Sequence, residues 1–259
     1  MITLSSAELH TWIAALLWPL TRILGLIAVA PLFGNRSVPA RVKVGLGVML
    51  ALIVAPTVPA LPALDPMSLP GLLILVQQFI IGLAMGFAMR IVFSAVELAG
   101  TITGMTMGLG FATFFDPQSQ GQSMVISQFM VLLATLAFLA VNGHLMLLSA
   151  LAESFFTLPI ASSGMGAPGF EQVASWGGRI FSAGVQLSLP MVAALLITNI
   201  ALGILTRAAP QLNIFGIGFP ITLSVGFIVI ALALPYLATP LGRLFQDGIE
   251  MVQRVAMPG

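Results

Sequence analysis

Charged residues are scarce in this sequence. Nine Lys and Arg and eight Asp and Glu make up 7% of its 259 residues, whereas hydrophobic residues make up 59% and the mean hydropathy is +1.10. A helix of roughly 20 apolar residues crosses the hydrocarbon core of a bilayer. The scarcity of charge therefore excludes most classes of soluble enzyme and predicts a protein surrounded by lipid or by other apolar helices. Long stretches without any charged residue include 44–64, 66–89, 180–206 and 208–242.

Cysteine is absent from the sequence and histidine is rare. The absence of cysteine excludes disulfides, thiolate metal sites and a cysteine nucleophile. Neither histidine, His10 or His144, has a carboxylate at metal-ligand spacing, and the sequence carries no metalloprotease, hydrolase or phosphate-loop motif. The net charge of +1 is too small to indicate a nucleic-acid partner. We therefore expect no catalysis, no metal, no cofactor and no binding of nucleic acid.

Six apolar segments follow one another with short connections. Because a backbone in lipid must form its hydrogen bonds internally, continuous apolar runs of this length predict helices rather than strands. Prolines inside the runs, among them Pro19, Pro190 and Pro235, favour bent helices. We predict an all-α, polytopic membrane protein with a single domain over residues 1–259, built from about six long apolar helices in kinked hairpins. The predicted segments are 11–33, 44–61, 70–97, 123–150, 180–206 and 213–239.

Three charged residues lie within the predicted segments. A charge at bilayer depth is costly unless it is paired or hydrated. Arg22 lies in the middle of the first segment. Arg90 and Glu97 are two helical turns apart and share a face, so a neighbour can bridge them. Alternatively, both lie close enough to the end of their segment to reach the membrane interface.

The C-terminal residues 241–256 form an amphipathic pattern. Apolar side chains recur at helical spacing on one side, with charged and amide side chains on the other. This pattern predicts a helix that lies either on a membrane surface or on a protein partner.

Residues 105–117 and the glycines before them form the most unusual stretch. Gly100, Gly104 and Gly108 recur every four residues and favour close helix contact. One interpretation is a helix-packing segment that ends in a turn; the other is a movable, plug-like loop that closes a passage. We call residues 105–117 the gate segment. The second interpretation assigns the seal to Met105, Met107, Phe111, Phe114 and Phe115, the hinge to Gly108 and Gly110, and the far anchor to Asp116 and Pro117.

A short polar motif joins the last two apolar segments. It begins at Arg207, which can cap the carbonyl groups of the preceding helix. Gln211 and Asn213 can satisfy backbone groups in the turn. The motif therefore predicts a tight antiparallel hairpin with a structural role. Its residues are Arg207, Pro210, Gln211, Asn213, Gly218 and Pro220.

The sequences MTMGLGFATFFDPQ (105–118) and TRAAPQLNIFGIGFP (206–220) resemble the signatures of the FliR family. That family is the flagellar counterpart of the SctT subunits of type III secretion injectisomes. The resemblance extends over essentially the full chain through its length, its six apolar segments and the order of its motifs. The second motif is the more specific one, and its Gly-Phe-Pro end favours the flagellar branch.

The resemblance implies a noncatalytic structural and gating subunit of the flagellar export channel, in the bacterial inner membrane within the basal body. Such subunits form a helical assembly with FliP-like and FliQ-like subunits, contact an FlhB-like subunit, and let unfolded flagellar proteins pass. The family's loop rich in Gly, Phe and Met plugs the closed channel, which implies the same role for the gate segment. The alternative is a small-solute secondary transporter or channel, which internal repeats would favour.

Overall fold

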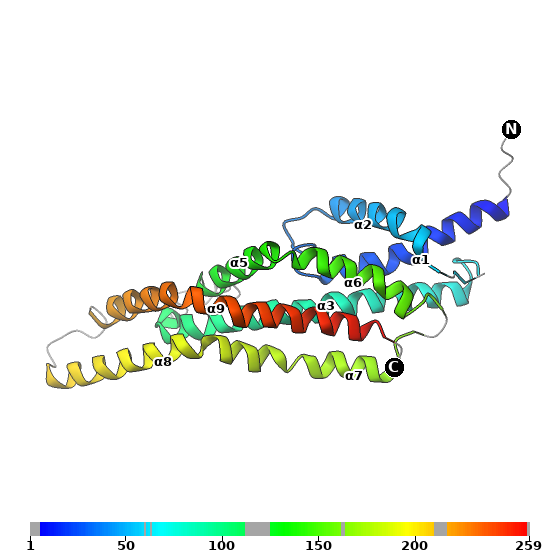
Figure 1. The fold of residues 1–259 in the computed structure, drawn as a ribbon. Coiled ribbons are helices and arrows are strands. Elements are labelled where there is room, and N and C mark those ends of the chain that lie inside the picture. The colour runs from blue at the N-terminus through cyan, green and yellow to red at the C-terminus, as the bar shows by residue number, and fades with distance from the viewer. Residues whose placement is uncertain are drawn as a thin grey trace. The chain divides into compact units, whose positions relative to one another are not determined.

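The computed structural model describes residues 6–59, 61–62, 64–111, 125–161, 164–209 and 217–257. Every regular element in these ranges is helical, which confirms the predicted all-α fold (Figure 1). The elements are α1 (Ser6–Val29), α2 (Ala40–Val54), η1 (Ala55–Thr57), α3 (Leu69–Thr106), η2 (Leu109–Phe111), α5 (Val125–Ala140), α6 (Gly143–Thr157), α7 (Ala167–Trp176), α8 (Arg179–Ala208) and α9 (Phe219–Val255).

The number of long apolar helices is smaller than the predicted six. Within the described residues, four helices are long and apolar enough to cross a membrane, and a fifth is reached if α5 and α6 count as one interrupted span. The predicted count of six is therefore corrected to four or five.

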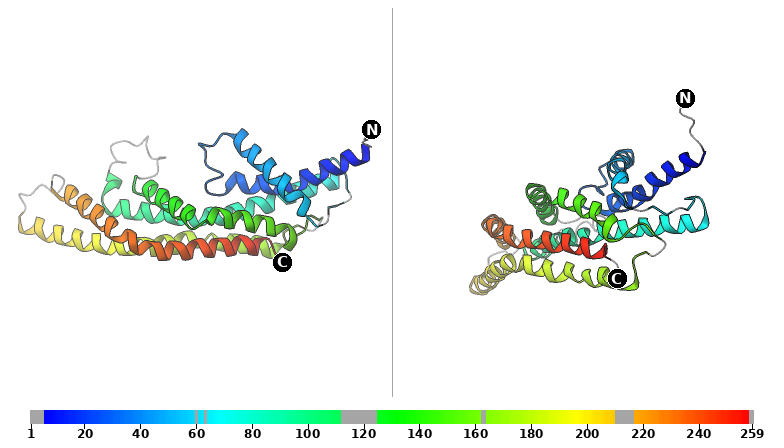
Figure 2. Two further views of the ribbon diagram at one scale, coloured as in Figure 1. Left: turned by 45° about the horizontal axis from the view of Figure 1, so that its top comes forward. Right: turned by 45° about the vertical axis from the view of Figure 1, so that its right-hand side comes forward.

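The contacts within the chain divide it into two compact units. Unit 1 contains α1, α2, α3 as far as Ile91, α6, α7 and the end of α9 from Phe245. Unit 2 contains α3 from Val92, α5, α8 and α9 as far as Leu244. The helices of each unit can be followed from two further directions in Figure 2. Both α3 and α9 therefore contribute to each unit.

Close contact between α1 and α3 in unit 1 depends on glycine. A Cβ atom at Gly82 of α3 would collide with the carbonyl oxygen of Arg22 in α1. A Cβ atom at Gly25 of α1 would lie 2.5 Å from the carbonyl oxygen of Phe79 in α3. Gly86, one turn after Gly82, meets the α1 backbone in the same way. Small residues let apolar helices approach to backbone contact, so these glycines set the distance between the two helices.

In unit 2 the second part of α3 is the central helix. A Cβ atom at Gly100 would collide with the backbone of Ser127 in α5. On another side, a Cβ atom at Gly184 of α8 would lie 3.1 Å from the carbonyl oxygen of Ala95. The Ala95 side chain itself is fully buried. α5 and α8 therefore pack directly against this part of α3.

Local chemistry explains both ends of α3. At the start, the Ser68 hydroxyl accepts a hydrogen bond of 3.2 Å from the Gly71 amide, which is the interaction of an N-cap residue. At the end, Gly108 has a φ of 90°, a left-handed conformation that glycine adopts without steric cost. Its amide donates to the carbonyl oxygen of Met105 at 3.0 Å. A left-handed glycine of this kind commonly terminates a helix.

The predicted amphipathic segment 241–256 is the last part of α9 rather than a separate helix. Pro235 and Pro240 lie inside α9 without ending it. The apolar side of the segment is buried in unit 1, where Phe245, Ile249 and Val252 are each at most 6% exposed. This side of the helix is therefore covered by protein.

Candidate functional site

The C-terminal end of α3, from which the gate segment begins, is buried in unit 2. Thr103 and Met107 are both fully buried. The Thr103 hydroxyl donates to the carbonyl oxygen of Ala99 at 2.8 Å and lies 3.8 Å from the sulfur of Met191 in α8. The start of the gate segment is therefore held between helices.

Met107 packs directly on α9. A Cβ atom at Gly226 would lie 2.5 Å from Cε and 2.6 Å from Cγ of Met107, so a side chain at residue 226 would require Met107 to shift. The Thr222 hydroxyl lies 3.2 Å from the carbonyl oxygen of Met107 and 3.0 Å from that of Phe219. Its single proton is shared between these two acceptors. In this structure Met107 is thus an anchor for the end of α3.

The two predicted hinge glycines have different surroundings. Gly108 has the positive φ described above, and any other residue would be strained there. Gly110 lies in η2, and a Cβ atom at this position would meet no heavy atom within 4 Å. The backbone therefore requires glycine at residue 108 and tolerates a side chain at residue 110.

The remaining residues of the gate segment are only partly described. Met105 lies in the last turn of α3 and is 58% exposed. Phe111 is the last residue of η2. The other predicted members lie outside the described residues: Phe114, Phe115, Asp116 and Pro117.

Arg22 is fully buried in unit 1 and makes four hydrogen bonds. Its Nε donates to Oε1 of Gln78 in α3 at 2.8 Å. One terminal nitrogen, Nη1, donates to the carbonyl oxygen and the hydroxyl of Ser154 in α6, at 2.7 and 3.0 Å. The other, Nη2, donates to the carbonyl oxygen of Leu158 at 2.8 Å. We call Arg22, Gln78, Ser154 and Leu158 the Arg22 cluster.

Neutral groups stabilise the charge of Arg22. All four acceptors are uncharged, and two are carbonyl groups at the C-terminal end of α6, where the helix dipole is negative. The guanidinium carbon also lies 4.4 Å from the ring centroid of Phe155, within the range of a cation–π interaction. The predicted intramembrane charge is therefore a connection between α1, α3 and α6.

Arg90 and Glu97 lie on the exposed face of α3. Because α3 extends to Thr106, neither residue lies at the end of its helix. The described residues include no ion pair between them. The structure therefore leaves both charges directed away from the helices that α3 contacts.

The hairpin motif is only partly described. Arg207 is exposed in the last turn of α8, where a basic side chain complements the helix dipole. Gly218 is buried just before α9, and Pro220 lies in the first turn of α9, where a missing amide proton costs nothing. Pro210, Gln211 and Asn213 lie outside the described residues.

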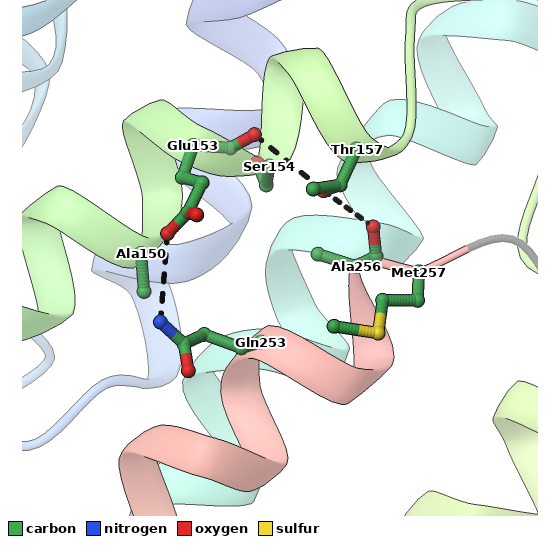
Figure 3. A pocket seen from close by; sticks show the side chains of 7 residues that line it. All are labelled: Ala150, Glu153, Ser154, Thr157, Gln253, Ala256 and Met257. Carbon is green, nitrogen blue, oxygen red and sulfur yellow. Dashed lines mark hydrogen bonds between the residues drawn. The ribbon is translucent and has the colours of Figure 1, made fainter.

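A small cavity of about 120 Å³ lies between α6 and the end of α9 in unit 1 (Figure 3). The Thr157 hydroxyl donates to the carbonyl oxygen of Ala256 at 2.7 Å. Across the cavity, Gln253 and Glu153 approach to 3.5 Å. These contacts hold the C-terminal part of α9 on α6. Ser154 lines the cavity and also belongs to the Arg22 cluster, so the two sites are neighbours in unit 1.

Sequence reasoning missed the partners of Arg22 and Met107. Two of the groups that bind Arg22 are backbone carbonyls, which no side-chain pattern reveals. Thr222 and Gly226 stand in an apolar run that also suits ordinary membrane helix packing. The only available signal was their spacing of four residues, which places them on one face of α9.

Comparison with known proteins shows to which family the chain belongs. The family described as "Bacterial export proteins, family 1" matches residues 13–248. The chain belongs to this family. The match covers all of α2 to α8, most of α1 and most of α9, so both units lie within it.

Curated relatives of this export family cover nearly the whole chain. A flagellar biosynthetic protein FliR of Pectobacterium carotovorum subsp. carotovorum is 43% identical over 252 residues, which are 97% of this chain and 96% of the relative. The protein of that name from Escherichia coli (strain K12) is 44% identical over 247 residues, 95% of this chain and 94% of its own. That of Bacillus subtilis (strain 168) is 32% identical, with 90% and 91% covered. The resemblance to the FliR family is therefore confirmed.

Proposed function

We propose that this chain is a structural and gating subunit of the flagellar type III protein export channel. The observation that carries the proposal is full-length membership of the bacterial export family, with relatives named as flagellar biosynthetic proteins. The long apolar helices support a position in the bacterial inner membrane, within the flagellar basal body. Its role is to let unfolded flagellar proteins pass, without catalysis by the chain itself.

The partners follow from the same proposal. The chain assembles with FliP-like and FliQ-like subunits and contacts an FlhB-like subunit. Large exposed apolar surfaces support assembly. In the most apolar part of Ala167–Ala208 only 11% of the residues are buried within the chain, whereas 50% are buried in the most apolar part of Leu69–Thr106. Exposed apolar surface of this extent requires lipid or other subunits to cover it.

The gate segment closes the channel at rest in this proposal. A passage wide enough for an unfolded chain leaks ions unless apolar side chains fill it. The buried end of α3 supplies a fixed base, and Gly108 supplies a backbone joint beyond it. Movement of the residues after Gly108 then opens the passage without moving α3. The hairpin motif around Arg207 and Pro220 holds α8 and α9 together as a structural element.

A deletion strain tests the proposed function. Removal of the gene is expected to abolish secretion of hook and filament proteins into the medium, and the wild-type chain on a plasmid restores it. A tagged chain is expected to purify from inner membranes together with other flagellar export subunits. Normal secretion by the deletion strain, or loss of uptake of a small solute with secretion intact, contradicts the proposal.

A further inference from the structure

The uncharged first part of α3 ends at Arg90. Residues 66–89 carry no charged side chain, and Arg90 follows them directly. Along the helix axis Arg90 lies about 31 Å from Leu69, the first residue of α3, at a rise of about 1.5 Å per residue. The hydrocarbon core of a bilayer is about 30 Å thick. When the start of α3 lies at one surface of this core, Arg90 therefore lies among the lipid headgroups at the other surface.

Trp176, at the end of α7, lies at the same height along α3. Its indole N–H donates to the carbonyl oxygen of Ala88, two residues before Arg90, at 3.0 Å. Tryptophan is enriched where lipid meets water, because its ring is apolar and its N–H is polar. Two separate features of unit 1, a base after an uncharged run and a tryptophan beside it, therefore indicate the same headgroup level.

An open apolar cleft of about 480 Å³ lies beside α3 just before this level. Leu83 and Phe87 form its α3 side, and Phe170 and Val173 of α7 form another side. All of its lining residues are apolar, and all belong to unit 1. Phe87 and Phe170 are 45% and 50% exposed, so the chain leaves much of this lining uncovered. We call this feature the α3–α7 cleft.

Arg90 lies one turn beyond the end of the α3–α7 cleft. It follows Phe87 by three residues and therefore shares its face of α3. Its side chain is exposed and forms no ion pair or hydrogen bond with the described residues. Glu171 of α7 is also exposed but does not line the cleft. The described part of unit 1 thus combines an apolar cleft with an unpaired guanidinium group at one end.

We propose that unit 1 binds one anionic phospholipid, with an acyl chain in the α3–α7 cleft and its phosphate on Arg90. The apolar lining accepts the acyl chain, and the guanidinium group offers phosphate oxygens two parallel N–H donors. The bound lipid covers Phe87 and Phe170 and supplies the counter-charge of Arg90. The inference goes beyond the proposed function, because it requires a membrane around unit 1 whatever the assembled complex transports.

Other occupants provide only part of this chemistry. Free phosphate would bind Arg90 but would leave the cleft empty. An apolar protein helix would fill the cleft but would have to bring its own acid to Arg90, at a level where the bilayer already supplies phosphate groups. A zwitterionic phospholipid carries an ammonium group that offsets the attraction between its phosphate and Arg90. An anionic phospholipid provides both the apolar chain and the net negative charge.

Photolabelling tests the site in the complex that purifies with the tagged chain from inner membranes. The complex is placed in phosphatidylcholine nanodiscs that contain phosphatidylglycerol with a diazirine near the end of one acyl chain. After illumination, mass spectrometry locates the label. We expect label on the cleft side of α3, from Ile80 to Phe87, and on α7 from Phe170 to Ala174. No label at these positions in the intact complex would overturn the proposal.

Competition with unlabelled lipids tests the headgroup in the wild-type complex. An excess of phosphatidylglycerol should lower the label in the cleft about tenfold, whereas phosphatidylethanolamine should lower it about twofold or less. Inorganic phosphate should leave it unchanged. The matched control is the label on α2 at the exposed Met49 and Leu52, which the two phospholipids should lower equally. Equal competition by the two phospholipids in the cleft, or competition by inorganic phosphate, would overturn the proposal.

Substitution of Arg90 tests the phosphate contact. Arg90→Gln should lower the label in the cleft about tenfold, and Arg90→Lys, which keeps the charge without the paired donors, about twofold. Arg41→Gln removes another exposed base, on α2, and should leave the label in the cleft unchanged. Unchanged label in an intact Arg90→Gln complex would overturn the proposal.

Filling the cleft tests the acyl-chain contact. Ala84 lines the α3–α7 cleft, so Ala84→Trp should occupy part of its volume and lower the label on α7. The matched control is Ala201→Trp, at an exposed position of α8 that does not line the cleft. If Ala84→Trp and Ala201→Trp give the same label on α7 in intact complexes, the acyl chain does not lie in the cleft and the proposal is overturned.

Discussion

The Arg22 cluster in unit 1 and the Met107 contact in unit 2 fasten helices in opposite ways. Arg22 joins α1, α3 and α6 through four hydrogen bonds to buried acceptors. Met107 joins α3 to α9 through apolar packing on Gly226 and one shared hydrogen bond from Thr222. Separation of the first contact would strand a buried charge and several acceptors. Separation of the second would strand one carbonyl group.

These two contacts indicate which part of the molecule is able to move. Buried polar groups that lose their partners cost the full desolvation penalty, whereas apolar contacts slide or repack at lower cost. We therefore expect the Arg22 cluster to stay closed during export and the end of α3, with Gly108 beyond it, to be the place that yields. Each prediction below changes one side of this comparison.

The largest effect is expected for Arg22→Ala. It leaves Oε1 of Gln78 and the carbonyl oxygen of Leu158 without the donor that Arg22 supplies, while the carbonyl oxygen of Ser154 keeps only the Leu158 amide. Each buried acceptor that is left unsatisfied costs about 1–3 kcal/mol. The melting temperature of the chain in the detergent-solubilised complex should fall strongly, or the complex should not form. Arg22→Lys keeps the charge with fewer donors, so its melting temperature should lie between those of the wild type and Arg22→Ala. The control Arg41→Ala, at an exposed position of α2, should change little; equal effects at both positions would contradict the cluster.

The second effect concerns the glycine contact between α1 and α3. Gly82→Ala places a Cβ atom against the backbone of Arg22 and should destabilise the chain by about 1–3 kcal/mol. Gly45→Ala in α2 meets no atom within 4 Å and should be neutral or stabilising by about 0.5–1 kcal/mol. Melting temperatures of the two variants measure the contrast. A stable Gly82→Ala variant would mean that α1 and α3 are further apart than described.

The third effect separates the two glycines of the gate segment. Gly108→Ala forces a side chain into the left-handed region and should cost roughly 1–2 kcal/mol. It should also lower secretion, because the joint beyond α3 is strained. Gly110→Ala meets open space and should secrete at the wild-type level. The measurement is the amount of filament protein secreted per cell. If Gly110→Ala lowers secretion more than Gly108→Ala does, the joint is at Gly110 instead.

The smallest effect is expected for Thr222→Val. It removes the hydroxyl that is shared with the carbonyl oxygen of Met107 and should cost about 0.5–1.5 kcal/mol. Thr222→Ser keeps the hydroxyl and serves as the control. If the end of α3 yields during export, Thr222→Val should leave assembly intact and raise the resting ion leak slightly. Lost assembly with Thr222→Val alone would show that this contact is structural.

Composition and hydropathy were sufficient to predict the helical class and the approximate positions of the apolar segments. They were not sufficient for the number of spans, because the break at Asn142, which has a φ of 57°, separates α5 from α6 within one apolar run. The spacing of Gly100, Gly104 and Gly108 also marked them as small residues suited to helix contact. Which backbone each one meets depends on tertiary packing.

The candidate site was predictable only in part for the same physical reason. Gly108 and Arg22 stand out in the sequence because glycine-rich and charged positions are unusual in apolar runs. Two of the four acceptors of Arg22 are backbone carbonyl groups, and the burial of Met107 involves its contact with Gly226, more than 100 residues away in the chain. Contacts of this kind have no local signature.

Conductance of the assembled complex tests most directly whether the gate segment seals a channel. The complex is inserted into a planar bilayer without substrate, and the variant carries Phe111→Ala, Phe114→Ala and Phe115→Ala together. A matched control replaces three exposed phenylalanines of other elements with alanine: Phe156, Phe181 and Phe227. We predict that the gate variant assembles and conducts ions while the wild type and the control remain closed. An intact gate variant that stays as tight as the wild type would contradict the account.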